Sequence, residues 1–160
     1  MLVTIMTEPT PAPQATPSLP PQIIKVCDGL YLGSGVHAVM AHPALCALPT
    51  RIVINCAKEY LYEPNLDLMA AHTTLPINAC DPISFLENVD TAVDYIDRAR
   101  ARGLNTYLHG DRSQSRALAV AIYYLMMRCG KTYYEAKGQL EDVLPLAIDE
   151  CLEDVLSIID

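Results

Sequence analysis

Residues 105–126, NTYLHGDRSQSRALAVAIYYLM, contain the side chains best suited to chemistry in this sequence. They predict a short apolar strand, a polar loop and an amphipathic helix. A loop between a strand end and a helix N-terminus presents unpaired backbone N–H groups and the positive end of the helix dipole, so it favours a bound anion. Arg116 would stand at the start of this helix, where its planar guanidinium can hold two phosphate oxygens. The alternative is an ion pair with a surface carboxylate, but a positive charge at a helix start favours a bound phosphate.

The composition limits the classes of partner. The chain has 160 residues, of which 51% are apolar, so it is long enough for one domain with a substantial core. Its 11 Lys and Arg residues against 19 Asp and Glu residues give a net charge of −8, and no basic stripe appears. We therefore expect neither nucleic-acid binding nor docking on an anionic membrane.

The cysteines indicate a reducing compartment. The chain has 6 of them, with no Cys-x-x-Cys pair and no clustered histidines, which argues against a structural zinc site. We expect no metal and no cofactor. The N-terminal residues MLVTIMTEP lack the basic region of a secretory signal and the length of a transmembrane segment. These features predict a cytoplasmic or nuclear protein.

Prolines divide the chain into a leader and a domain. Residues 1–21 contain Pro9, Pro11, Pro13, Pro17, Pro20 and Pro21. Such a segment cannot sustain a helix or pair as a central strand, so it predicts a flexible leader. The folded domain is expected over residues 22–160.

Short strands alternate with helices along this domain. The expected strands are two within residues 23–33 that turn at Asp28 and Gly29, then 51–56, 72–77 and 106–110. The expected helical segments are short turns in 36–48, part of 60–71, a helix from a Ser84–Glu87 capping box to Gly103, residues 115–130, a helix from a Thr132–Glu135 capping box towards Pro145, and 148–159. The pattern predicts an α/β domain with a central mixed or parallel sheet flanked by helices.

Several motifs resemble one enzyme family. Residues 109–116, HGDRSQSR, resemble the His-Cys-x-x-x-x-x-Arg signature of the cysteine-based protein phosphatases, with Gly110 at the cysteine position. Further matches follow in the family's order: GLYLG at 29–33, RIVINC at 51–56, Asp81 after LPIN and before a long helix, and IYYLMM at 122–127. The sequence is similar to dual-specificity phosphatases over roughly residues 23–159.

The resemblance implies a role for each matched residue. Asp81 would be the general acid, Ser115 the hydroxyl that helps the thiolate leave, and His109 the residue that orders the loop. The phosphate-binding loop would comprise Asp111, Arg112, Ser113, Gln114, Ser115 and Arg116. In active members of the family a thiolate attacks phosphorus and the arginine holds the equatorial oxygens.

The sequence departs from this pattern inside the loop. Gly110 has no side chain, so no thiolate can form and the covalent route is closed. Ser113 stands where the family usually has glycine, and Asp111 adds a carboxylate that Arg112 partly offsets. A related group of pseudophosphatases carries the same glycine, and the loop resembles that group.

Three functions remain open at this point. The first is a pseudophosphatase that binds phosphotyrosine or phosphothreonine proteins without hydrolysing them. The second is an active dual-specificity phosphatase, present here as an inactive variant with Gly110 in place of the nucleophile. The third is an interaction scaffold with no phosphate role, because the acidic residues between 141 and 154 could repel phosphorylated partners. The sequence does not determine the oligomeric state.

Overall fold

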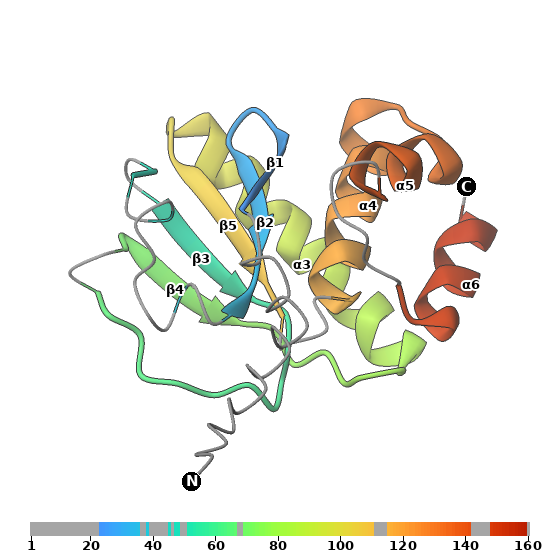
Figure 1. The fold of residues 1–160 in the computed structure, drawn as a ribbon, viewed down its shortest axis with the longest axis horizontal. Helices are drawn as coiled ribbons and strands as arrows, with labels where there is room; N and C mark the ends of the chain where they lie inside the picture. Colours follow the sequence, from blue (N-terminus) through green and yellow to red (C-terminus); the bar gives the residue numbers. More distant parts are fainter. Residues whose placement is uncertain are drawn as a thin grey trace, which may run out of the picture.

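A mixed five-stranded sheet forms the centre of the protein (Figure 1). The computed structural model describes residues 23–35, 38, 45, 47–48, 51–66, 69–110, 115–141 and 148–159. The strands are β1 (Ile24–Cys27), β2 (Leu30–Gly33), β3 (Arg51–Asn55), β4 (Ala71–Thr74) and β5 (Asn105–His109). They lie in the order β1-β2-β5-β3-β4, with β1 antiparallel to β2 and every other pair parallel. The α/β class expected from the sequence is confirmed.

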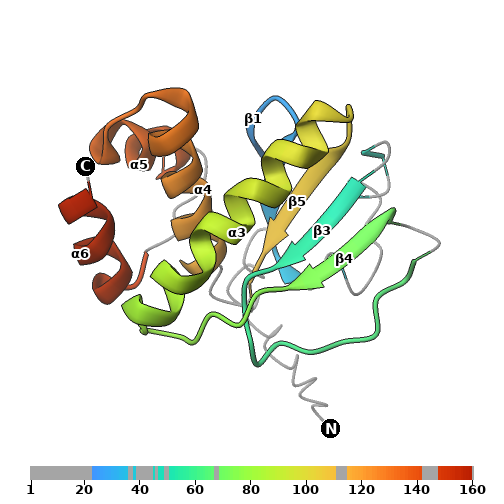
Figure 2. The same ribbon diagram turned by 180° about the vertical axis from the view of Figure 1, so that it is seen from behind.

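The main core lies between the sheet and its helices. These are α3 (Pro82–Ala101), α4 (Ser115–Cys129), α5 (Tyr133–Glu141) and α6 (Glu150–Ile159). Figure 2 shows α3 lying across one face of the sheet, where it contacts β5, while α4 contacts β2 and β5 and carries α5 and α6. Side chains buried in this core include Leu32, Ile54, Leu108, Phe85, Ile96, Leu118 and Ile122. A second cluster, with Val53, Tyr107 and Met69, lies on the other face of the sheet.

The long helix α3 begins earlier than the capping box at Ser84 and Glu87 predicts. Its N-cap is Asp81, whose Oδ1 accepts hydrogen bonds from Ile83 N at 3.1 Å and Ser84 N at 3.2 Å. Pro82 occupies the first helical position, which suits a residue with no N–H to satisfy. Asp81 is therefore the N-cap of α3 instead of Ser84, and the predicted Ser84–Glu87 capping box is wrong.

Two other boundaries differ from the predictions. The strand expected at 72–77 is β4, Ala71–Thr74, and it stops before Pro76, which has no N–H to donate to a ladder. The helix expected within 60–71 is absent from the described residues of that range, where Pro64 interrupts the chain. Most of the segment 36–48, the leader 1–21 and the approach to Pro145 lie outside the described residues.

The second predicted capping box is confirmed. Thr132 N donates to Glu135 Oε2 at 2.8 Å, and Glu135 N donates to Thr132 Oγ1 at 3.2 Å. It stands at the start of α5. None of the helices in the described part of the chain has both the length and the apolar character needed to cross a bilayer.

Substitutions of Phe85 and of its neighbour Leu86 test the assignment of the main core. Phe85 is 0% exposed and packs edge to face on Tyr123, with ring centroids 6.3 Å apart, whereas Leu86 is 45% exposed. We expect Phe85→Ala to lower the free energy of unfolding by about 3–5 kcal/mol, since it leaves a cavity. Leu86→Ala should cost less than about 1 kcal/mol. Urea unfolding measures both, and equal losses would contradict this assignment of the core.

Candidate phosphate-binding site

The carboxyl ends of three parallel strands meet where the loop begins. His109, the last residue of β5, is paired with Gly33 at the end of β2 and with Asn55 at the end of β3. Gly110 follows, and α4 begins at Ser115. Ligands of open α/β sheets bind at this edge, between strands whose connections diverge. The predicted loop residues Asp111, Arg112, Ser113 and Gln114 lie outside the described part of the chain.

Arg116 lies in the first turn of α4 and is only 1% exposed. Its Nη1 donates to Glu59 Oε2 at 2.7 Å and to the carbonyl oxygen of Ile77 at 2.7 Å, and its Nη2 donates to Glu59 Oε1. The guanidinium therefore holds both oxygens of one carboxylate, the arrangement in which it would hold two oxygens of a phosphate. The carboxylate alternative considered from the sequence is thus present, and Glu59 is the acceptor.

Glu59 reaches Arg116 from a turn that is tied to the strand ends. Asn55 Oδ1 accepts from Ala57 N at 2.9 Å, and Asn55 Nδ2 donates to Tyr60 O at 2.6 Å. Cys56 N donates to His109 O at 2.7 Å, which attaches the same turn to β5. The Arg116 hydrogen bond holds the pKa of the Glu59 carboxyl below its usual value. Even so, the Glu59 side chain is 55% exposed, so it can leave Arg116 for water.

His109 is held by a chain of hydrogen bonds that fixes its tautomer. Its Nδ1 lies 2.9 Å from Gly110 O, and a carbonyl can only accept, so Nδ1 carries the proton. Its Nε2 then accepts from Tyr62 Oη at 2.8 Å, and Tyr62 Oη accepts from His72 Nε2 at 2.9 Å. Burial lowers the pKa of His109 to about 4, so the ring is neutral at pH 7. His109 therefore contacts the backbone at the loop start, where a loop-ordering residue would act.

This buried histidine predicts an acid-sensitive fold. The unfolded chain binds a proton on His109 below about pH 6.5 that the folded protein excludes until about pH 4, so stability falls with pH in that window. We expect a loss of about 2 kcal/mol between pH 7 and pH 4.5 from this group. The carboxylates with lowered pKa, such as Glu59, lose their contribution mainly at lower pH.

Urea unfolding at pH 7 and pH 4.5 measures the effect. His109→Gln removes the titration, so the variant should lose less stability between the two pH values than the unsubstituted protein does. Burial also lowers the pKa of His72, which adds a smaller loss to both proteins. Equal losses would show that His109 does not control the acid response.

Asp81, the predicted general acid, serves here as a helix cap. Besides Ile83 N and Ser84 N, its carboxylate accepts from Asn78 Nδ2 at 3.4 Å. The backbone hydrogen bond from Ser84 is the largest cause that lowers the Asp81 pKa. A general acid must carry a proton at working pH, so this arrangement favours the ionised form that cannot donate one.

Ser115 links the start of α4 to the C-terminal segment. Its Oγ accepts a hydrogen bond from Asp149 N at 2.7 Å, just before α6 begins. The residue expected to assist a leaving thiolate therefore also anchors the chain that precedes α6. Within the described ranges, no group of three or more His, Cys, Asp or Glu side chains is arranged to hold a metal ion.

Glu59, Tyr62, His72 and Gly35 belong to this site, although the sequence did not single them out for it. A Cβ on Gly35 would lie 2.7 Å from Gly110 O and 2.5 Å from Tyr60 Cε1, so only glycine fits there. The one available signal was Asn55 at a strand end, four positions before Glu59. Tyr62 and His72 gave no such signal in the sequence, because the hydrogen bond between them depends on the path of the loop between β3 and β4.

Comparisons with known proteins identify the fold. No family model matches the chain. No curated protein sequence matches it either. Human DUSP28 superposes with a TM-score of 0.74 at 20% identity, covering 90% of this chain and 95% of that one.

Two further solved structures agree. A putative mouse dual specificity phosphatase, solved with zinc tungstate, gives a TM-score of 0.75 at 19% identity, covering 92% of this chain and 91% of its own. The human tyrosine phosphatase-like serine/threonine/tyrosine-interacting protein gives 0.72 at 20% identity, covering 86% and 94%. The chain has the fold of the dual-specificity phosphatases, as its motifs predicted.

Proposed function

From this phosphatase fold, we propose that the protein is a pseudophosphatase, a binding module for phosphotyrosine or phosphothreonine proteins that it does not hydrolyse. The observation that carries the proposal is the guanidinium of Arg116, which is buried at the start of α4 and already holds a carboxylate through two nitrogens. The position before the loop that would bear the nucleophile is Gly110. We call Gly110, Ser115 and Arg116 together the phosphate cradle. Because the cradle keeps the arginine and lacks a nucleophile, it suits phosphate binding without hydrolysis.

Phosphate binding would be an exchange at Arg116. A phosphate group carries nearly two negative charges and three acceptor oxygens, against one charge and two oxygens on Glu59. The exposed Glu59 side chain can move into water, while Ile77 O keeps its hydrogen bond to Arg116 Nη1. The exchange therefore breaks the ion pair between Glu59 and Arg116, whose carboxylate water can solvate, and forms a stronger, buried ion pair between the phosphate and Arg116.

The chain's own residues support binding more than hydrolysis. Gly110 provides no nucleophile, and Asp81 is an ionised helix cap that offers no proton to a leaving oxygen. His109 still holds the backbone carbonyl of Gly110, so the loop can be ordered without a catalytic step. A cytoplasmic or nuclear location is part of the proposal, since phosphoprotein partners are found there.

Calorimetry with matched peptides tests the proposal. We expect phosphotyrosine or phosphothreonine peptides to bind at least about tenfold more tightly than their unphosphorylated counterparts. Inorganic phosphate should compete with the phosphopeptides. Equal binding of both peptide forms would overturn the proposal and favour a scaffold with no phosphate role.

A further inference from the structure

A pocket lies between the C-terminal half of α3 and the edge of the sheet, and it shares only His72 with the residues assigned to the phosphate-binding site. It has a volume of about 400 Å³ and is lined by Ile52, Ala71, His72, Thr73, Tyr95, Arg98, Ala99 and Arg102. β4 is the edge strand on that side of the sheet. The volume falls in the range of ordinary ligand sites. We call it the α3–β4 pocket.

The pocket holds two arginines without carboxylate partners. Among the arginines that the structure describes, the other four are engaged: Arg51 with Leu48 O, Arg100 with Tyr124 Oη, Arg116 with Glu59 and Arg128 with Asp97. Arg98 and Arg102 are exposed and make no ion pair or side-chain hydrogen bond with any described residue. In a chain with a net charge of −8, two free cations on one pocket are unexpected.

Compensation of the helix dipole explains only part of this arrangement. Basic residues near a helix C-terminus are favourable, and Arg98, Arg100 and Arg102 all stand there. However, Arg100 points to the other side of α3, and dipole compensation requires no adjoining pocket. The His72 ring is already bonded to Tyr62, so the positive charge of the pocket comes from the two arginines.

We propose that the α3–β4 pocket binds an acidic segment of a partner protein in extended form, through carboxylates on alternate residues. Arg98 lies in the last turn of α3 and Arg102, four positions later, is its C-cap, so the two side chains start roughly 6 Å apart along the helix axis. Alternate side chains of an extended peptide point the same way and repeat every ~6.6 Å. A Glu-x-Glu segment therefore places one carboxylate on each guanidinium, where bidentate pairs can form.

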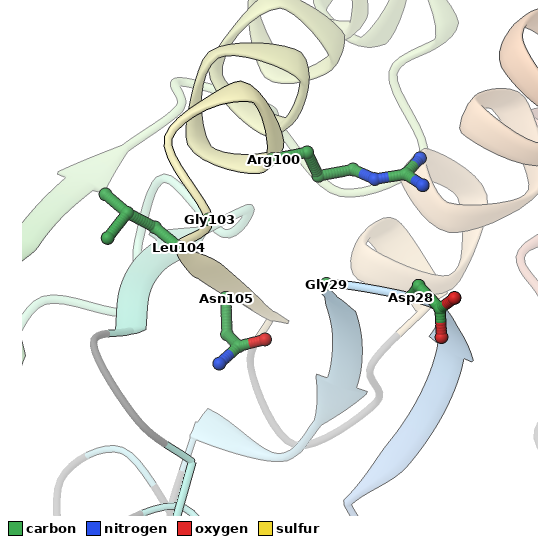
Figure 3. Close-up of a pocket in the computed structure, with 6 residues that line it drawn as sticks. All are labelled: Asp28, Gly29, Arg100, Gly103, Leu104 and Asn105. Carbon is green, nitrogen blue, oxygen red and sulfur yellow. The ribbon is translucent and has the colours of Figure 1, made fainter.

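The pocket at the other side of α3 lacks this character. It is lined by Asp28, Gly29, Arg100, Gly103, Leu104 and Asn105, at the end of β5 opposite His109 (Figure 3). Figure 3 shows Arg100 running from α3 towards α4, where it bonds Tyr124 Oη at 2.6 Å, and Asp28 pairs with Lys25 at 2.8 Å. Because Arg100 and Asp28 already have partners, the acidic ligand is assigned to the α3–β4 pocket alone.

Fluorescence anisotropy with a short alternating Glu-Thr peptide at low ionic strength tests the proposal. Arg98→Gln/Arg102→Gln should weaken binding by about tenfold or more. Lys25→Gln/Lys131→Gln removes the same charge from sites outside the pocket and should change affinity by less than about twofold. Because all four side chains lie outside the core, the variants should unfold at similar urea concentrations.

Four results would overturn the proposal. Equal losses in the two double variants would indicate general electrostatic attraction, and equal affinity for a Gln-Thr peptide would exclude carboxylate recognition. A loss of Glu-Thr peptide binding in Arg116→Ala, with none in Arg98→Gln/Arg102→Gln, would place the peptide in the phosphate cradle. Binding to phosphatidylserine vesicles that needs Arg98 and Arg102, with no peptide binding, would assign the pocket to membranes instead.

Discussion

Arg116→Ala should lower phosphopeptide affinity by about 100-fold, because two charge-assisted hydrogen bonds to the phosphate are lost. Arg116→Lys keeps the charge but not the planar fork, so its loss should be smaller, about tenfold. Arg128→Ala is the matched control, since Arg128 stands on the same helix and also holds a carboxylate, that of Asp97, at 2.7 Å. Its phosphopeptide affinity should stay within about twofold of the unsubstituted protein.

Glu59→Gln should act in the opposite direction. The neutral amide no longer competes for Arg116 as an anion, so phosphopeptide affinity should rise several-fold. Stability should fall, because the buried guanidinium loses its counter-charge, although the exposure of Glu59 limits the loss to about 1 kcal/mol. Calorimetry and urea unfolding measure the two effects. Unchanged phosphopeptide affinity in both Glu59→Gln and Arg116→Ala would show that the phosphate binds elsewhere.

The elements with strong local signals could be predicted from the sequence. The turn at Asp28 and Gly29 joins β1 to β2, and Gly29 has a φ of 81° that suits glycine. The apolar, β-branched run after Arg51 forms β3 in the middle of the sheet. The strand and the helix expected on either side of the loop appear as β5 and α4, with β5 one residue earlier than the predicted 106–110. In each case the residues that determine the element are neighbours in the chain.

The site could be predicted only in part, because its main contacts join distant segments. Glu59 and Arg116 meet across 57 positions, and their contact depends on how Asn55 folds the turn after β3. Nothing in the residue pattern indicates that Tyr62 bridges His72 and His109. The prediction of where α3 starts was wrong for a different reason. Asp81 and Ser84 are both good N-cap residues, and only Pro82 favours Asp81.

Gly110→Cys provides the sharpest test of whether the scaffold retains catalytic competence. The introduced thiol would stand at the end of β5 near the N-terminus of α4, which favours the thiolate. We expect slow hydrolysis of p-nitrophenyl phosphate, at least about 100-fold faster than with Gly110, because this leaving group needs no proton. Phosphothreonine peptides should stay intact, since their alkoxide leaving group needs an acid and Asp81 is an ionised cap. Release of p-nitrophenol and of inorganic phosphate measures the two reactions.

A second substitution in the Gly110→Cys background separates the roles of Asp81. Asparagine caps a helix as well as aspartate does, so Asp81→Asn preserves α3 while removing any proton donor. The p-nitrophenyl phosphate rate should be unchanged within about twofold in either case, because this leaving group needs no proton, so it shows that the substitution leaves the site intact. If Asp81 is only a cap, phosphothreonine peptides should stay intact with both variants. Rapid hydrolysis of phosphothreonine peptides by Gly110→Cys, lost again in Gly110→Cys/Asp81→Asn, would instead show an intact phosphatase scaffold that lacks only its nucleophile. That result would favour the active enzyme over the pseudophosphatase, because Asp81 would then leave its cap to donate a proton.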